Sequence, residues 1–168
     1  MSFLWKSQEK IISAKVFVGS PGTTIPTSAA GPGDFTTKLL FQTLIYDDLS
    51  TVVSMVDNRL IIPTGYRRCR INYCLAWDLN ATGWRGCRIK NSVGSNYGNV
   101  RMPSVGAAAS TNNSLVTSWI NISSSVNVSP DTIQVGDYFE FWPAQNSGVS
   151  LICGADSASS WVSLELQL

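Results

Sequence analysis

Histidine is absent from all 168 residues of the sequence. Without an imidazole, the chain can form neither a Ser-His-Asp triad nor a Cys-His nucleophile pair. None of the four cysteines belongs to a C-x-x-C pair, and the phosphate-binding pattern G-x-x-x-x-G-K-[ST] does not occur. We therefore predict no catalytic residue, no metal site and no cofactor. A hydrolase that works with carboxylates alone needs no histidine, so that one enzyme class stays open.

Charge is also scarce. Charged residues make up 14% of the chain and apolar residues 44%, and the net charge is +1. Disordered chains have the opposite composition, so we expect one folded domain. The net charge favours neither nucleic acid nor an anionic membrane as a partner. A surface with few charges suits contact with other proteins instead.

The sequence lacks a secretory signal and a long apolar run. Met1–Lys10 holds three charged residues and no apolar h-region, and no run approaches the ~20 apolar residues that span a bilayer. We expect synthesis in the cytosol, where disulfides are rare. Cys69, Cys87 and Cys153 lie among apolar neighbours at strand spacing, so we predict that they are buried free thiols.

Strand signals dominate what the sequence does contain, and no stretch of eleven residues has convincing helical periodicity. The clearest strand is Tyr66–Asp78, whose odd positions from Cys69 to Trp77 predict one buried face. We predict that Trp84–Lys90 is its hairpin partner, and that 23–33 and 91–106 are loops. The other predicted strands are Ile11–Val18, Lys38–Tyr46, Arg59–Ile62, Leu115–Val128, Val135–Trp142, a strand through Val149, Leu151 and Cys153, and Val162–Leu168. About eight strands without helices between them predict an all-β sandwich or jelly roll.

Basic and aromatic residues leave alternatives open. The basic residues gather around two predicted strands; they are Arg67, Arg68, Arg70, Arg85, Arg88 and Lys90. They form either the solvated face of those strands or an electrostatic patch for an acidic protein partner. The tryptophans either fill the core, fill a subunit interface or provide a platform on which sugars stack.

Four motifs follow one another in the order found in a known family. They are LLFQTLIYDD at 39–48, NRLIIPTGY at 58–66, VGDYFEF at 135–141 and SWVSLEL at 160–166. Together they resemble the C1q/TNF-like jelly roll, and the resemblance covers Lys38–Leu168. It implies an antiparallel β-sandwich over residues 36–168, preceded by an extended N-terminal arm and loop over residues 1–35. Animal members usually have a signal peptide and often a collagen stalk; the Ser/Thr/Asn/Gly-rich style here is instead similar to C1q-like domains of tailed bacteriophage virions.

The resemblance implies a non-enzymatic virion structural protein. We expect a capsid decoration (cement) protein that binds the major capsid protein shell and stabilises it. It would lie on the outer capsid surface after synthesis in the host cytoplasm. The alternative is the receptor-binding tip of a tail fibre or head fibre that recognises a host-surface glycan or protein. The resemblance also implies a homotrimer, with candidate interface residues Tyr73, Tyr138, Phe141 and Trp161.

The N-terminus has three large apolar residues in a row, Phe3, Leu4 and Trp5. A free terminus that exposed them would invite aggregation. The loop after the first strand is long enough for Met1–Val18 to leave its own domain and pair with the capsid protein or an adjacent trimer. The alternative is an arm that packs on its own subunit. The candidate partner-binding residues are Phe3, Leu4 and Trp5 on the arm, and Arg67, Arg68, Arg70 and Arg88 on the barrel.

Overall fold

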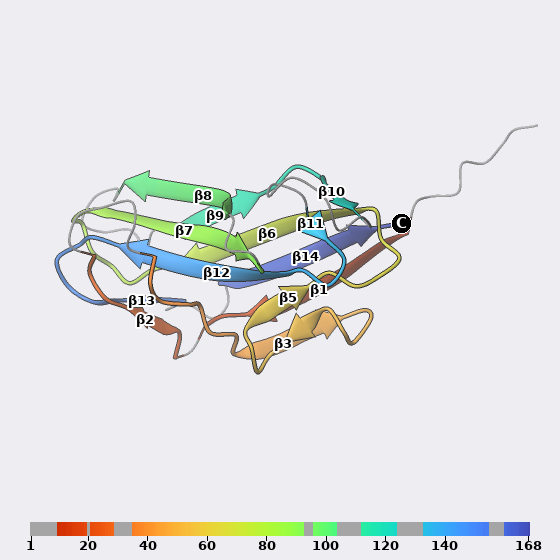
Figure 1. Cartoon of the computed structure of the whole chain (residues 1–168). Helices are drawn as coiled ribbons and strands as arrows, with labels where there is room; N and C mark the ends of the chain where they lie inside the picture. Colours follow the sequence, from red (N-terminus) through yellow and green to blue (C-terminus); the bar gives the residue numbers. More distant parts are fainter. Residues whose placement is uncertain are drawn as a thin grey trace, which may run out of the picture.

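The computed structural model describes residues 10–19, 21–28, 35–92, 96–103, 112–123, 133–154 and 160–168. Within these ranges the chain forms fourteen β-strands and no helix. Most strands belong to two sheets that lie one over the other (Figure 1). The prediction of an all-β antiparallel sandwich is confirmed. No helix among the described residues is long and apolar enough to cross a membrane.

The first sheet has the order β11-β10-β6-β14-β1-β3, and β9 also pairs with β6. Its strands are β1 (Ile11–Phe17), β3 (Thr43–Asp47), β6 (Arg68–Ala76), β9 (Asn112–Val116), β10 (Ile120–Ser123), β11 (Ile133–Gln134) and β14 (Trp161–Gln167). On one side, β6 pairs first with β10 and then with β9. Between β10 and β9, Thr117 satisfies the backbone of β6 in place of a paired strand residue. Its N–H donates to the Ile71 carbonyl, and its hydroxyl accepts from the Ile71 N–H.

The second sheet has the order β4-β5-β12-β7-β8. Its strands are β4 (Val53–Ser54), β5 (Arg59–Ile61), β7 (Trp84–Asn91), β8 (Asn96–Pro103) and β12 (Tyr138–Gln145). Two short strands, β2 (Thr23–Ile25) and β13 (Leu151–Cys153), form a separate antiparallel pair.

The core fills the space between the two sheets. Three central strands supply much of it, with Cys69, Ile71, Tyr73 and Leu75 from β6, Phe139 and Phe141 from β12, and Val162, Leu164 and Leu166 from β14. The Tyr73 ring meets the Phe141 ring edge-on with 6.1 Å between centroids, which joins the two sheets. The buried face predicted for Tyr66–Asp78 is therefore confirmed.

The strands β6 and β7 do not form the predicted hairpin. β6 pairs with β14, whereas β7 pairs with β12 in the other sheet. The connection between them crosses from one sheet to the other, and the buried guanidinium of Arg85 holds it by donating to the carbonyls of Asn80 and Thr82 at 2.5 and 3.0 Å. The prediction was wrong because a period of two shows which face of a strand is buried, not which strand lies beside it.

Two predicted loops contain strands. The stretch 23–33 includes β2, and the stretch 91–106 includes β8. Glycine, proline, serine and threonine around both strands masked them, since these residues favour turns. The predicted inner face near β13 is correct for Leu151 and Cys153, but Val149 is exposed.

The strand predicted over Lys38–Tyr46 begins only at Thr43. Before Thr43, backbone N–H groups donate hydrogen bonds to acceptors that are distant in the sequence. The Phe41 N–H, for example, donates to the Asn58 side-chain oxygen at 2.5 Å. At Phe41, a side-chain oxygen thus takes the place of the backbone carbonyl that a neighbouring strand would provide.

The strand β1 lies inside the first sheet, between β14 and β3. Its seven residues pair in register with Gln167 through Trp161. The hypothesis that Ile11–Val18 leaves the domain to pair with another protein is therefore wrong, because this ladder is made within the chain. The predicted boundary after residue 35 also leaves β1 and β2 with the arm, although both are hydrogen-bonded to later strands. Phe3, Leu4 and Trp5 lie outside the described residues.

Candidate binding face

The outer surface of the second sheet gathers charged and aromatic side chains around β12. Alternate residues of a strand point to opposite faces. Phe139 and Phe141 point into the core, so Tyr138, Glu140 and Trp142 face outward. Among these three, Glu140 lies at the centre and is the most buried, at 8% exposure.

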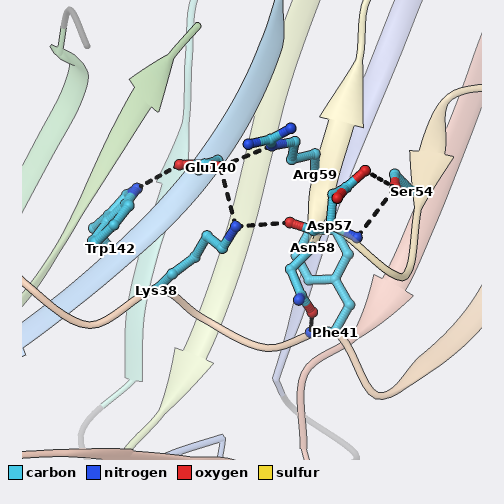
Figure 2. Close-up of polar contacts among 8 residues, drawn as sticks. All are labelled: Lys38, Phe41, Ser54, Asp57, Asn58, Arg59, Glu140 and Trp142. Atoms are coloured by element: carbon cyan, nitrogen blue, oxygen red, sulfur yellow. Dashed lines mark hydrogen bonds and ion pairs between the residues drawn. The ribbon is translucent and has the colours of Figure 1, made fainter.

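Glu140 accepts three side-chain hydrogen bonds (Figure 2). Its Oε1 accepts from Lys38 Nζ at 3.1 Å and from Arg59 Nε at 2.8 Å. Its Oε2 accepts from the Trp142 indole N–H at 3.2 Å. A buried carboxylate needs such partners, because removing an ion from water is costly unless it is paired.

The charge state of Glu140 follows from these contacts. Burial by itself would raise the pKa of the carboxyl group, but hydrogen bonds from Arg59 and Lys38, together with their charges, outweigh burial and lower the pKa. The hydrogen bond to Glu140 is in turn the main reason why the pKa of Arg59 is raised. Glu140 is therefore an ionised anchor with both oxygens engaged.

The turn between β4 and β5 positions Arg59 and Lys38. The Asp57 N–H donates to Ser54 Oγ at 3.2 Å, and the Ser54 hydroxyl donates to Asp57 Oδ2 at 3.0 Å. Asn58 follows with a φ of 54°, a left-handed conformation that asparagine tolerates. Lys38 donates to the Asp57 carbonyl at 2.8 Å, which ties it to the same turn (Figure 2).

Three cations on this surface lie over aromatic rings. The Arg59 guanidinium is 3.9 Å from the Tyr138 centroid, and Lys90 Nζ is 3.9 Å from the Trp142 centroid. Arg88 lies 4.3 Å from the centroid of Phe35. We call this surface the cation–aromatic face; its residues are Phe35, Lys38, Arg59, Arg88, Lys90, Tyr138, Glu140 and Trp142.

Cations outnumber carboxylates among the residues of the cation–aromatic face that the structure describes. They are Lys38, Arg59, Arg88 and Lys90, against Glu140 and, at the rim, Asp57. Burial and the nearby charge of Arg88 lower the pKa of Lys90, and the charge of Glu140 partly offsets them. Half-buried cations of this kind gain from an anion, since attraction strengthens as water is displaced.

The basic cluster predicted from the sequence is divided between the two sheets. Arg67 and Arg68 are exposed on the first sheet. Arg70, also there, forms an ion pair with Glu165 and lies 4.9 Å from the Trp119 centroid. Arg88 and Lys90 lie on the second sheet. The prediction of one patch was wrong because it depended on a β6–β7 hairpin.

The candidate interface residues do not share one surface either. Tyr73 and Phe141 are buried in the core of the chain, at 1% and 0% exposure. They therefore cannot contact another subunit in this fold, which corrects the prediction for these two residues. Tyr138 lies on the cation–aromatic face, whereas Trp161 lies on the first sheet, with Lys15 Nζ 4.2 Å from its centroid.

Sequence reasoning missed Lys38, Arg59 and Trp142 as members of one site. The alternation of Tyr138, Glu140 and Trp142 predicts that they share a face, and this signal was available. No sequence signal brings in Lys38 and Arg59, because they lie about 80 to 100 residues before Glu140 and reach it only through the sheet register.

The prediction of buried free thiols is confirmed. Cys69, Cys87 and Cys153 are buried, and no disulfide joins them. Burial raises the pKa of all three, to about 12 for Cys69. Cys74 is only partly buried. Over the described ranges, no three His, Cys, Asp or Glu side chains gather where they could hold a metal ion.

Comparison with known proteins supports the fold. No family model matches the sequence, and no curated protein matches it. The chain is similar to a solved structure of Eiger TNF from S. frugiperda, with a TM-score of 0.56 and 8% sequence identity over 94% of this chain and 92% of that chain. At such low identity the similarity concerns the fold alone. The chain therefore has the TNF-like jelly-roll fold that its four motifs predicted.

Proposed function

We propose that this chain is a non-enzymatic binding protein that contacts a protein partner through the cation–aromatic face. More narrowly, we propose a virion structural protein, a decoration protein that binds the major capsid protein on the outer surface of a phage head. The observation that carries the binding role is the gathering of four cations and three aromatic rings on the outer surface of one sheet, where Glu140 and the rings hold the cations in place.

The geometry of Glu140 supports a binding role over a catalytic one. A general acid or base must exchange a proton with substrate. Both oxygens of Glu140 are occupied by Lys38, Arg59 and Trp142, and the lowered pKa keeps the carboxylate ionised. This carboxylate therefore orients cations rather than transferring protons.

The fixed cations also favour binding. Long basic side chains lose rotamer freedom when they bind, which weakens association by about 0.5–1.5 kcal/mol each. Here Arg59, Lys90 and Arg88 are already held against Tyr138, Trp142 and Phe35. A partner therefore meets a surface that needs little ordering.

The virion assignment is supported by the Ser/Thr/Asn/Gly-rich composition, which is similar to that of C1q-like domains of tailed bacteriophage virions. It is tested on phage capsid shells. Purified protein is mixed with capsid shells that lack it, and the shells are sedimented and imaged by cryo-electron microscopy. We expect saturable binding over the head and higher resistance of the shells to heat. Binding confined to the tail, or no binding to shells, would refute the decoration role.

A receptor-binding fibre tip is the second candidate. It is favoured by Trp119 and Trp161, which are partly exposed on the outer surface of the first sheet beside Arg70 and Lys15. Aromatic rings in such places are common in recognition surfaces. Binding of the labelled protein to intact host cells, abolished by Trp119→Ala and not by Arg88→Gln, would support this candidate over decoration.

A further inference from the structure

We infer that the edge strand β3 binds the N-terminal segment, residues 1–9, of a second copy of this chain, with Phe3, Leu4 and Trp5 against the apolar side chains of β3. Residues 1–9 lie outside the described residues, and their sequence, their number and their attachment to β1 support this contact. The contact involves the first sheet. It is independent of the proposed function, whose binding face lies on the second sheet.

The strand β3 has an open, apolar edge. It pairs with β1 and with no other strand of the described chain (Figure 1). Apolar side chains on the strand and just before it are each 36–45% exposed; they are Leu40, Leu44, Ile45 and Tyr46. Exposed apolar side chains on an edge strand invite contact with another chain.

A bulge indicates how this edge makes contact. The register of β3 against β1 shifts between two pairs, Tyr46 with Lys15 and Leu44 with Val16, so Ile45 has no partner on β1. A bulge interrupts the regular ladder of hydrogen bonds, which disfavours the addition of a further strand. Side chains rather than a long backbone ladder therefore provide the contact, and a short apolar segment is sufficient to cover them.

The sequence of residues 1–9 matches this edge. Phe3, Leu4 and Trp5 are three large apolar residues in a row, as the apolar side chains of β3 are. Lys6 follows them directly, and the exposed Asp48 lies just after β3. A segment that runs parallel to β3 therefore brings apolar residues together and places opposite charges at the same end.

The register of β1 favours the segment of a second copy over that of the same chain. Leu44 lies opposite Val16, five residues after the start of β1 at Ile11. A segment attached before Ile11 has to reverse direction to reach Leu44 of its own copy. Two serines are the only residues of 1–10 that favour turns. If the segment is extended instead, its apolar residues lie about 20–26 Å beyond Ile11, within reach of a neighbouring copy.

The first test traps the contact with a disulfide between two copies. One preparation of the full chain has Leu4→Cys and the other Ile45→Cys, both with Cys74→Ser because the other three native thiols are buried. The two are mixed, oxidised with copper phenanthroline, and the mixed dimer is identified by mass spectrometry. We expect at least about tenfold more of it than in a control mixture of Leu4→Cys with Leu79→Cys, because docking raises the local thiol concentration. Leu79 is 64% exposed on the connection between β6 and β7.

The same two cysteines in one chain test the alternative occupant. A chain with Leu4→Cys and Ile45→Cys that links only within itself, while the mixture gives no more dimer than the control, would assign the segment to its own copy. No link in either arrangement would leave β3 to a different partner protein. Both results would overturn the inference. Tyr46→Cys replaces Ile45→Cys if that variant does not fold.

The second test removes the apolar side chains from the segment of the full chain. Phe3→Ser with Trp5→Ser is compared with Ser2→Ala with Ser7→Ala, which also changes two residues of the segment. Light scattering after size exclusion measures the mass at several concentrations. We expect the first variant to associate at least about tenfold more weakly and the second to associate like the wild type. Equal association of the two variants, or a wild type that stays monomeric at micromolar concentration, would overturn the inference.

Discussion

At the scale of single residues, Glu140 gives a prediction about stability. Glu140→Gln would leave Lys38 and Arg59 close together without their shared carboxylate. Removing one partner of a fully buried ion pair costs 3–5 kcal/mol, but these cations are about a third exposed, so we expect a loss of about 1–3 kcal/mol. Urea unfolding measures it. Glu165→Gln, which removes the partner of Arg70 at a more exposed site, should cost less.

The same residue predicts a pH dependence. The pKa of Glu140 in the folded chain lies below its ordinary value of 4.5. The ionised carboxylate therefore stabilises the folded state fully above that value, and this contribution is lost as the pH falls through the lowered pKa. We expect the free energy of unfolding to fall more steeply below pH 4.5 in the wild type than in Glu140→Gln. Parallel curves for the two proteins would show that Glu140 is not stabilised as the carboxylate.

The cysteines give a prediction about reactivity. A thiol reacts as its thiolate, and burial raises the pKa of Cys69 to about 12 and that of Cys87 and Cys153 above the ordinary range. At pH 8 we expect a thiol reagent such as iodoacetamide to modify the partly buried Cys74 first and the other three only after unfolding. Mass spectrometry of the digested protein identifies the modified residue. Rapid modification of Cys87 in the folded protein would contradict its burial.

At the scale of elements, the sequence predicts which face of a strand is buried better than it predicts which strands pair. Alternation along Tyr66–Asp78 and around Phe139 identified the buried side chains, because the period of a strand is local. It could not show that β6 pairs with β14 and β7 with β12, since those pairs join distant residues. For the same reason, alternation along the strand could place Glu140 on one face with Tyr138 and Trp142. It could not show that Lys38 and Arg59, which are distant in the sequence, reach Glu140.

The crossing between β6 and β7 predicts a sensitive glycine. Gly83 has a φ of +75°, and a Cβ there would lie 2.5 Å from the Asn146 backbone oxygen. Gly148 has a φ of +87° with nothing within 4 Å of its Cβ position. Both Gly→Ala changes should lower stability by about 1–2 kcal/mol, because alanine is strained in the left-handed conformation. Only Gly83→Ala also pushes its segment away from Asn146, which should lower stability by about 1–3 kcal/mol more. Thermal unfolding of the two variants checks this difference, and equal melting temperatures would contradict it.

At the scale of the whole molecule, apolar side chains remain exposed around one sheet edge. In the described chain, β3 pairs only with β1. Leu40, Leu44, Ile45 and Tyr46 on or beside β3 are each 36–45% exposed. Edge strands with exposed apolar side chains invite contact with further chains unless something covers them. These residues were not among the interface candidates, because the sequence predicted a strand there without showing that it lies at an edge.

The last prediction is that copies of the chain cover this edge in a homotrimer. Light scattering after size exclusion should give about 55 kDa, three times the 18.2 kDa of the chain. Leu44→Glu with Tyr46→Glu should shift the mass toward the monomer, because buried charges without partners oppose association. Val56→Glu is the control for placing a carboxylate at an exposed apolar position, since Val56 is 92% exposed on the turn before β5 and its replacement should leave the mass unchanged. A monomer mass for the wild type at micromolar concentration would refute the trimer, whereas a trimer that survives both changes at β3 would move the contact elsewhere, with the partly exposed Trp161 and Tyr138 as the next residues to replace.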